Sequence, residues 1–288
     1  MFEHSVVQVS DTHLSAERAY GYDGWLACLS YIREQAPNFV AVTGDLVLDD
    51  PDDEEDQRFT RDQLGQIPVP WVAVPGNHDV GDANPSPYMN QHVNESRLAR
   101  YLRYYGTDRW VKDLGRWRLI GLNALLLGTG LEAEEEQYDW LSAQVLAEPS
   151  RPLAMFLHKP LCINRLDEAS SPDVCVLPKG RDRLLQVLSG ANLRLVASGH
   201  NHHFRTALID GIQMVWAPST SQVVQMPRPF RAQLRPGLVQ YWFGDDAVEF
   251  ALVEPNGIEA SDVTHLIASY RAMRFAPRLP VSARAFGG

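Results

Sequence analysis

Cysteine is scarce in this sequence: Cys28, Cys162 and Cys175 are the only three among 288 residues. An odd number without a C-x-x-C spacing argues against a disulfide framework and favours reduced thiols. Cys162 stands close in sequence to a histidine of interest, His158, but a packing role is the expectation for it. The cysteines therefore indicate a protein of a reducing compartment.

Long apolar runs are also missing. No run approaches the roughly 18 apolar residues that a membrane span requires. The first expected strand begins by Val6, which leaves no room for a cleavable leader with a basic start and an apolar core. We therefore expect a cytoplasmic protein that does not associate with membranes.

Basic residues are outnumbered, with 26 Lys and Arg against 36 Asp and Glu and a formal net charge of −10. Such a chain repels polyanions overall, whereas nucleic-acid binders normally carry a basic face. Large nucleic acid is therefore disfavoured as a partner. Hydrophobic residues at 45% and charged residues at 22% are typical of globular proteins and exclude disordered and fibrous classes.

Polar clusters recur along the chain in a fixed order, and each follows a short apolar run. The runs at residues 6–10, 39–43 and 71–75 are rich in β-branched residues, as in buried strands. Loops at the carboxyl ends of such strands converge on one crevice, where α/β proteins bind ligands. The clusters are Asp11-Thr12-His13, Gly44-Asp45, Gly76-Asn77-His78-Asp79, His158 and Gly199-His200-Asn201-His202.

Seven potential metal ligands would meet in that crevice. Seven are too many for one tetrahedral zinc and suit two cations that share a bridging carboxylate. Any one of these motifs alone is more often a turn, a helix cap or a core histidine, but five in order make coincidence improbable. His4, His92 and His203 lack such support and are expected to be ordinary surface or packing histidines. The seven are Asp11, His13, Asp45, Asn77, His158, His200 and His202.

The set resembles, motif by motif, the D-x-H, GD, GNH[D/E], H and GH-x-H pattern of the calcineurin-like metallophosphoesterases. The resemblance covers most of the first two hundred residues and is strongest to the bacterial class III cyclic-nucleotide phosphodiesterase and glycerophosphodiesterase group. It implies an α/β fold, a four-layer sandwich with two central mixed β-sheets flanked by helices.

The resemblance also implies roles for the ligands. Asp45 would bridge two cations, and imidazole with oxygen ligands suits manganese, iron, zinc or cobalt without selecting among them. The implied reaction is in-line attack of a metal-bridging hydroxide on a phosphodiester. One cation would be held by Asp11, His13 and His202, and the other by Asn77, His158 and His200.

His78 directly follows the ligand Asn77, and the resemblance makes it the catalytic residue. As imidazolium it would stabilise developing charge or donate a proton to the leaving group. It would contact phosphate oxygen without binding metal, with Asn77 as a further substrate contact. Asp79 either orients His78 or caps the following turn.

Departures from the family pattern narrow the substrate. Residues 44–49 lack the arginine that protein phosphatases of this superfamily carry after the Gly-Asp pair, so phosphoprotein phosphatase activity is disfavoured. We expect a small phosphodiester of the cyclic-nucleotide or glycerophosphodiester type. Lys159 stands where related enzymes usually have a second histidine. It would either bind a phosphate or carboxylate of the substrate or point to solvent.

Three alternatives remain. A lipid A pathway pyrophosphatase acting on a nucleotide-diphosphate lipid would need an apolar groove, and no lipid-binding insertion is evident between Asn77 and His158. Phosphomonoesterase activity would need a cation that grips a dianion, and Lys159 is the candidate. A non-catalytic scaffold, similar to the retromer subunit of this superfamily, would have lost ligands or His78, and none is lost here.

The rest of the chain predicts one domain over residues 1–260 and an arginine-containing tail over residues 261–288. Helices are expected at residues 22–35, 134–147 and 181–188, and residues 204–208, 214–216, 239–243 and 248–252 are expected to form consecutive strands of a mixed sheet.

Composition predicts the character of three further segments. The acidic run 49–56 indicates a solvated loop leading into a helix, because it lacks the pattern of a calcium loop. Residues 218–237 indicate a long irregular connection that could serve as a lid. The tail, with Arg271, Arg274, Arg278 and Arg284, is expected to pack on the acidic body, and a subunit contact in a homo-oligomer is the alternative.

Overall fold

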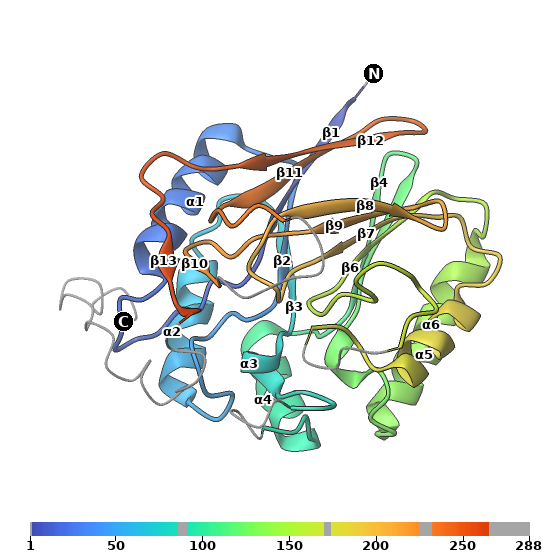
Figure 1. Ribbon diagram of the computed structural model, residues 1–288, viewed down its shortest axis with the longest axis horizontal. Coiled ribbons are helices and arrows are strands. Elements are labelled where there is room, and N and C mark those ends of the chain that lie inside the picture. Colours follow the sequence, from blue (N-terminus) through green and yellow to red (C-terminus); the bar gives the residue numbers. More distant parts are fainter. Residues whose placement is uncertain (1, 86–90, 170–173, 225–231, 265–288) are drawn as a thin grey trace.

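A computed structural model describes residues 2–85, 91–169, 174–224 and 232–264. Two large mixed sheets pack face to face, with helices on the outer side of each (Figure 1). Apolar side chains of both sheets fill the space between them, as Phe39 of one sheet and Phe156 of the other illustrate. The predicted four-layer α/β sandwich is confirmed.

The first sheet has the strand order β12-β11-β1-β2-β3. The strands β1, β2 and β3 are parallel, which brings their carboxyl ends to one edge, while β11 and β12 join by antiparallel pairing. These three parallel strands correspond to the apolar runs predicted at residues 6–10, 39–43 and 71–75, each of which a polar cluster follows. The bounds are β1 His4–Val9, β2 Phe39–Thr43, β3 Trp71–Val74, β11 Leu238–Phe243 and β12 Val248–Val253.

The second sheet has the strand order β4-β5-β6-β7-β9-β8. Its centre, β5 to β9, is parallel, and β4 and β8 are antiparallel edges. His158 and His200 follow β6 and β7, so these two clusters also leave carboxyl ends of neighbouring parallel strands. The bounds are β4 Trp110–Leu114, β5 Trp117–Gly121, β6 Leu153–Phe156, β7 Leu193–Ser198, β8 Arg205–Ile209 and β9 Ile212–Trp216.

The helices cover the two outer faces. Trp25 and Leu29 of α1 pack with Val7 and Val40 of the first sheet, and α5 and α6 cover the second (Figure 1). In the described part of the chain, no helix is long and apolar enough to cross a bilayer. The helices are α1 Tyr22–Gln35, α2 Glu54–Leu64, α3 Asn77–Val80, α4 Glu95–Tyr105, α5 Glu132–Ala147 and α6 Pro178–Val187, with a 3₁₀ turn at Ala124–Leu126.

Two element predictions need correction. The strands after residue 204 do not form one consecutive set, because β8 and β9 belong to the second sheet and β11 and β12 to the first. The connection 218–237 is not wholly irregular, since β10 (Gln222–Val223) pairs in parallel with β13 (Ser261–Asp262). Residues 225–231 of that connection lie outside the described residues, so its role as a lid stays a prediction.

Packing also continues beyond residue 260, where the sequence placed the start of a tail. The side chain of Val263 is 1% exposed, and its N–H donates to the Val223 carbonyl at 3.0 Å. The tail arginines at positions 271, 274, 278 and 284 lie outside the described residues, so the tail and its contacts stay predictions.

The acidic run 49–56 does lead into a helix, since Asp53 caps α2 by accepting from the N–H groups of Glu55 and Asp56. The prediction of a solvated loop is wrong for Asp49 and Asp56, which are buried. Asp52 and Glu54 instead pair with arginines of α4 and so join α2 to α4. The pairs are Asp52 with Arg97 and Arg100, and Glu54 with Arg100 and Arg103.

Asp56 gives the chain a pH-dependent stability. Its side chain is 3% exposed and accepts from the Ala16 N–H at 2.7 Å. Burial raises the pKa of Asp56 to about 7; the Ala16 hydrogen bond opposes this, and nearby Asp53 adds to it. Because the folded chain holds a proton that the unfolded chain releases near pH 4, this contribution to stability is lost as pH rises from about 4 to 7.

We therefore expect Asp56→Asn to flatten part of this dependence. The unfolding free energy of wild type should fall as pH rises toward 7, at about 1.4 kcal/mol per pH unit, and that of the variant should lack this fall. The difference, variant minus wild type, should therefore be roughly 2–3 kcal/mol larger at pH 8 than at pH 5. Urea unfolding of both proteins in chelator, at each pH, measures the difference. A constant difference across this range would show that Asp56 titrates normally.

The three cysteines are buried, and none is in a disulfide. Burial raises the pKa of Cys28, Cys162 and Cys175 to about 12 in each case. Cys162 belongs to the core between the second sheet and its helices, which confirms its predicted packing role. Buried thiols with raised pKa values are poor nucleophiles.

Candidate metal centre

The predicted ligands converge from both sheets on the gap between their carboxyl edges. Two hydrogen bonds join the loops of the two sheets here. The His200 N–H donates to Asp11 Oδ2 at 3.0 Å, and His158 Nδ1 donates to the Thr43 carbonyl at 2.7 Å. The loops after β1, β2 and β3 supply one half of the site, and those after β6 and β7 supply the other. The structure thus brings together groups that lie up to 191 positions apart, from Asp11 to His202.

Left-handed backbone concentrates at this site. Seven non-glycine residues of the described chain have positive φ, and five of them are predicted ligands. Non-glycine residues rarely adopt the left-handed backbone conformation. They keep it where the surrounding structure imposes it, often at functional sites. The five are Asp11, His13, Asp45, His200 and His202, with φ between 47° and 69°.

Two of the motif glycines are required by close approach. A Cβ at Gly76 would lie 2.1 Å from Asp45 N, and a Cβ at Gly199 would lie 1.8 Å from Ser10 Oγ. Any larger residue would push the loops after β2 and β3, or those after β1 and β7, apart. The glycines of the Gly-Asn-His-Asp and Gly-His-Asn-His motifs therefore allow the ligand loops to touch.

The first cluster of ligand atoms contains Asp11, His13, Asp45 and His202, with the ligand atoms all within 4.8 Å of one another. His13 Nε2 lies 3.0 Å from His202 Nε2, and His202 Nε2 lies 3.2 Å from Asp11 Oδ1. The Oδ2 atom of Asp45 is 3.9 Å from His13 Nε2. All four side chains are buried.

The second cluster contains Asp45, His158 and His200, and Asn77 joins it. His158 Nε2 lies 3.2 Å from Asp45 Oδ1, 3.1 Å from Asn77 Oδ1 and 3.2 Å from His200 Nδ1. Asp45 belongs to both clusters, with Oδ1 toward one and Oδ2 toward the other. This is the arrangement that a bridging carboxylate requires.

The donor set fits metal ions. A backbone carbonyl only accepts, so the bond from His158 to Thr43 places a proton on Nδ1, and Nε2, which faces the oxygens of Asp45 and Asn77, is the nitrogen that could offer a lone pair to a metal ion. Convergent lone pairs repel one another unless a cation or a proton lies between them. Nitrogen and oxygen donors of this kind suit divalent transition metals.

Opposing effects set the charges of the site. Burial favours neutral carboxyls, but the hydrogen bond and charge of His202 outweigh it and lower the pKa of Asp11 to about 2. For Asp45, His158 and His78 likewise outweigh burial and hold the pKa well below its ordinary value. Burial, helped by His78 and His202, lowers the pKa of His13 to about 3. Ionised carboxylates beside a neutral imidazole are the protonation states that ligate metal.

His158 differs from His13. Burial lowers the pKa of His158, but the charge and hydrogen bond of Asp45 outweigh it and raise that pKa to about 9. Without a cation, a proton therefore occupies the space between His158 and Asp45 near neutral pH. A metal ion entering the second cluster has to displace that proton, so binding there should release protons.

His78 lies beside both clusters but belongs to neither. Its Nδ1 donates to the Leu48 carbonyl at 2.8 Å, and its Nε2 lies 3.7 Å from Asp45 Oδ2. Its ring meets that of His13 edge-on, with the centroids 4.7 Å apart. The side chain is 6% exposed, so His78 is buried beside the centre, and its catalytic role stays a prediction.

Asp79 acts as a cap. Its carboxylate accepts from the N–H groups of Gly76, Leu46 and Val47 at 2.7, 2.9 and 3.1 Å. Asp79 therefore caps the start of α3 and the Asp45 loop, both of which precede it, instead of the following turn that was predicted. A backbone carbonyl, that of Leu48, orients His78 in place of Asp79. By holding residues of two loops, Asp79 joins the Asp45 loop to the Asn77 loop.

Lys159 has a partner that sequence reasoning missed. Its Nζ lies 2.5 Å from Asp82 Oδ2, and the side chain is 2% exposed. The alternative that Lys159 points to solvent is therefore wrong, whereas its contact with substrate stays a prediction. Asp82 follows the Gly-Asn-His-Asp motif by three residues, and no pattern in the sequence links it to Lys159.

The histidines set aside in the sequence do not join the clusters. His92 is exposed, whereas His203 is buried with its Nδ1 2.8 Å from the Asn201 carbonyl. His4 is partly buried at the start of β1.

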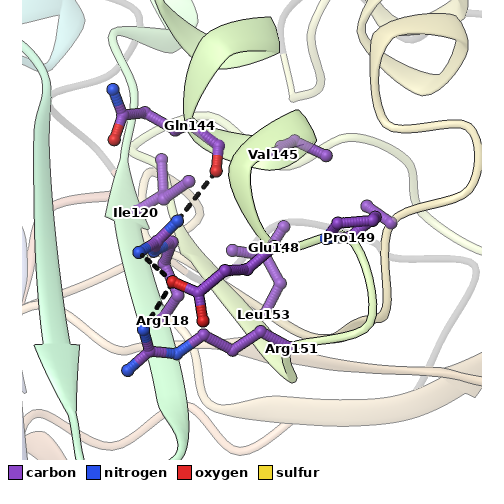
Figure 2. Close-up of a pocket in the computed structure, with 9 residues that line it drawn as sticks. Arg118, Ile120, Gln144, Val145, Glu148, Pro149, Arg151 and Leu153 are labelled. Atoms are coloured by element: carbon purple, nitrogen blue, oxygen red, sulfur yellow. Dashed lines mark hydrogen bonds and ion pairs between the residues drawn. The ribbon is translucent and has the colours of Figure 1, made fainter.

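A second group of charged side chains lies far from the centre. Figure 2 shows a shallow pocket between β5 and α5 that Arg118, Glu148 and Arg151 line. Both guanidinium groups are paired with Glu148 and with Asp113. The pocket includes Leu153, the first residue of β6, whereas His158 follows the opposite end of that strand. We assign these ion pairs to surface structure.

Comparison with known proteins agrees with this geometry. The chain is 27% identical over 240 residues to a probable glycerophosphodiester phosphodiesterase GpdQ of Arcobacter nitrofigilis, covering 77% of this chain and 80% of that protein. It is 24% identical over 276 residues to a probable cyclic nucleotide phosphodiesterase of Synechococcus, covering 86% and 95%. It is 30% identical over 191 residues to the serine/threonine-protein phosphatase CPPED1 of Danio rerio, covering 62% of this chain and 58% of that protein.

Solved structures share the fold. A dimetal phosphatase from Danio rerio superposes with a TM-score of 0.56 at 14% identity, covering 89% of this chain and 97% of that one. A purple acid phosphatase of yellow lupin superposes with a TM-score of 0.59 at 15% identity, covering 95% and 55%. The family model described as calcineurin-like phosphoesterase matches residues 4–204. The chain therefore belongs to the calcineurin-like phosphoesterase family.

Proposed function

We propose that this protein is a binuclear metal-dependent phosphodiesterase that hydrolyses a small phosphodiester, of the cyclic-nucleotide or glycerophosphodiester type. The observation that carries the proposal is the pair of ligand clusters that share Asp45, with His78 beside both. The two bacterial relatives named as phosphodiesterases support the same substrate class.

Each predicted ligand has a role in this proposal. When bound, the cations would supply Lewis acidity toward water and phosphate oxygen. Asp45 would hold both cations, which orients the two halves of the site relative to each other. One cation would be held by Asp11, His13 and His202, and the other by Asn77, His158 and His200.

His78 would act on the substrate itself. With Nδ1 donating to Leu48, its Nε2 is directed toward the centre and can donate to a phosphate oxygen or to the departing alkoxide. An imidazolium at this position would also add positive charge near the phosphorus, where negative charge develops in the transition state.

The charges around the centre favour diesters over monoesters. A phosphomonoester dianion needs more compensating positive charge than a diester anion. The arginine that protein phosphatases use is missing after Asp45, and Lys159 is neutralised by Asp82. A second candidate function, phosphomonoesterase, is kept because some relatives are named as protein phosphatases.

A substrate comparison decides between these two. On one manganese-loaded sample, we expect kcat/KM for bis(4-nitrophenyl) phosphate to exceed that for 4-nitrophenyl phosphate by about tenfold or more. Lys159→Met/Asp82→Asn, which removes both members of the ion pair, should leave this ratio within about threefold of wild type. A tenfold preference for the monoester would overturn the diesterase proposal, and its loss in the double variant would identify Lys159 as the cause.

We propose that the protein acts on a small substrate free in solution and does not bind large nucleic acid, because its net charge is −10. Diesterase assays with a cyclic nucleotide, a glycerophosphodiester and a DNA duplex, on one loaded sample, test this. Hydrolysis of the duplex at a rate comparable to the small diesters would contradict it.

A further inference from the structure

The Leu48 carbonyl is a shared acceptor for two histidines of the centre. His78 Nδ1 lies 2.8 Å from it and His13 Nδ1 lies 3.4 Å from it. Because a carbonyl only accepts, Nδ1 must present its proton to Leu48, and this bond fixes the plane of the His78 ring whether or not Nε2 is also protonated. The position of one backbone oxygen thus determines where His78 Nε2 is directed.

Leu48 is held in place by its N–H group and by its side chain. Its N–H donates to the Leu14 carbonyl at 2.9 Å, which secures it to the loop after β1. Its side chain is fully buried but does not belong to any of the three large cores. It packs instead with Val263 in a small separate cluster, against which Tyr20 and Val224 lie.

Val263 reaches this cluster through the ribbon of β10 and β13. The ribbon pairs Gln222 with Ser261 and Val223 with Asp262, and the Val263 N–H extends it by donating to Val223. Figure 1 shows the two short strands side by side, and they form a two-stranded sheet separate from the two large ones. The segment entering β10 is also tied to the centre, because Ser219 Oγ donates to the Asp11 carbonyl at 2.7 Å.

We propose that Val263 is a positioning residue for His78. Val263 packs against the Leu48 side chain, Leu48 presents its carbonyl to His78 Nδ1, and His78 Nε2 is thereby held toward the centre. Val263 lies 185 positions from His78 in the sequence. The expected effect of Val263 on the rate rests on the proposed role of His78 in phosphodiester hydrolysis. The expected effect of Val263 on the orientation of the His78 ring does not depend on that role.

Packing physics gives the direction of the effect. Interiors are close-packed, and a buried cluster that loses two methyl groups relaxes into the space left. Movement of Leu48 lengthens or bends the bond from His78 to its carbonyl and releases the ring. A misplacement of about 1 Å at a catalytic group can cost on the order of a hundredfold in rate, so a smaller shift here should cost about tenfold.

The test uses Val263→Ala with a matched control, Val145→Ala, which shortens a valine buried in α5 far from the centre. We expect Val263→Ala to lower kcat for a diester with a poor leaving group by about tenfold, with metal content and KM unchanged. Val145→Ala should keep wild-type kcat. Val263→Ile, which keeps a β-branched apolar side chain against Leu48, should retain most of the wild-type rate.

Two further readouts separate positioning from general destabilisation. In a His78→Ala background, Val263→Ala should cause no additional loss, because the group that it positions is gone. Selective ¹⁵N labelling of histidine should show a hydrogen-bonded proton at His78 Nδ1 in wild type and in Val145→Ala, and a weakened or lost Nδ1 hydrogen bond in Val263→Ala. Leu48→Ala should give the same spectrum from the other side of the contact.

An unchanged His78 spectrum in both Val263→Ala and Leu48→Ala would overturn the inference, as would an equal loss of kcat in Val145→Ala. If the wild-type protein hydrolyses no diester, the proposed function fails. The labelled spectra still decide whether Val263 positions His78, so the two failures are distinguishable.

Discussion

Replacement of His78 by alanine should lower kcat for a phosphodiester by about 10² to 10⁴, the range that proton transfer by a positioned side chain contributes. The residue lies next to both ligand clusters and fills neither. Its Nε2, 3.7 Å from Asp45 Oδ2, can donate to a group bound at the centre. The variant should therefore keep the full metal content and lose only the chemical step.

The leaving group distinguishes the two roles open to His78. If the ring is a general acid, the loss should be larger for a poor alkoxide than for 4-nitrophenolate, which leaves without a proton. Equal losses would indicate that the ring stabilises the phosphate oxygens instead. His92→Ala, which removes an exposed histidine, is the control and should keep wild-type rates with both substrates. A loss of metal from His78→Ala would contradict the assignment.

Much of the centre was accessible from the sequence because the ligands follow apolar runs. Parallel strands place their carboxyl ends at one edge, so the order of the clusters sufficed to predict that they meet. The helix α1 was predicted at its observed bounds, Tyr22–Gln35, from its apolar periodicity. By contrast, β4 was missed because three consecutive residues at its middle, Val111 to Asp113, are exposed, which hides the apolar pattern.

Other features depend on long-range packing that no local pattern encodes. The backbone carbonyl of Leu48 carries no side-chain signal, yet it orients His78. The pairing of Lys159 with Asp82 joins loops from different sheets. The division of β8, β9, β11 and β12 between two sheets depends on where each connection crosses, which strand propensity does not specify. The α4 helix, however, had a readable start at its cap, Asn94.

Asp45→Ala should abolish the binding of both metal ions, and this is the largest effect expected of any single ligand. The carboxylate contributes Oδ1 to the cluster of His158 and Oδ2 to that of His13. Its removal takes one donor from each cation and also the negative charge that offsets their mutual repulsion. Wild-type protein should hold close to two transition-metal ions per chain, as two complete ligand clusters require.

Elemental analysis after dialysis measures this loss directly, and thermal unfolding provides an independent readout. A ligand that binds only the folded chain stabilises it in proportion to its affinity, so added Mn²⁺ should raise the Tm of wild type and leave that of Asp45→Ala unchanged. Asp56→Asn is the matched control, because Asp56 is equally buried and lies outside both clusters; it should retain both ions. If Asp45→Ala keeps a full pair, Asp45 does not bridge. If it keeps one ion firmly, the two clusters bind independently, and the shared carboxylate is a ligand to only one of them.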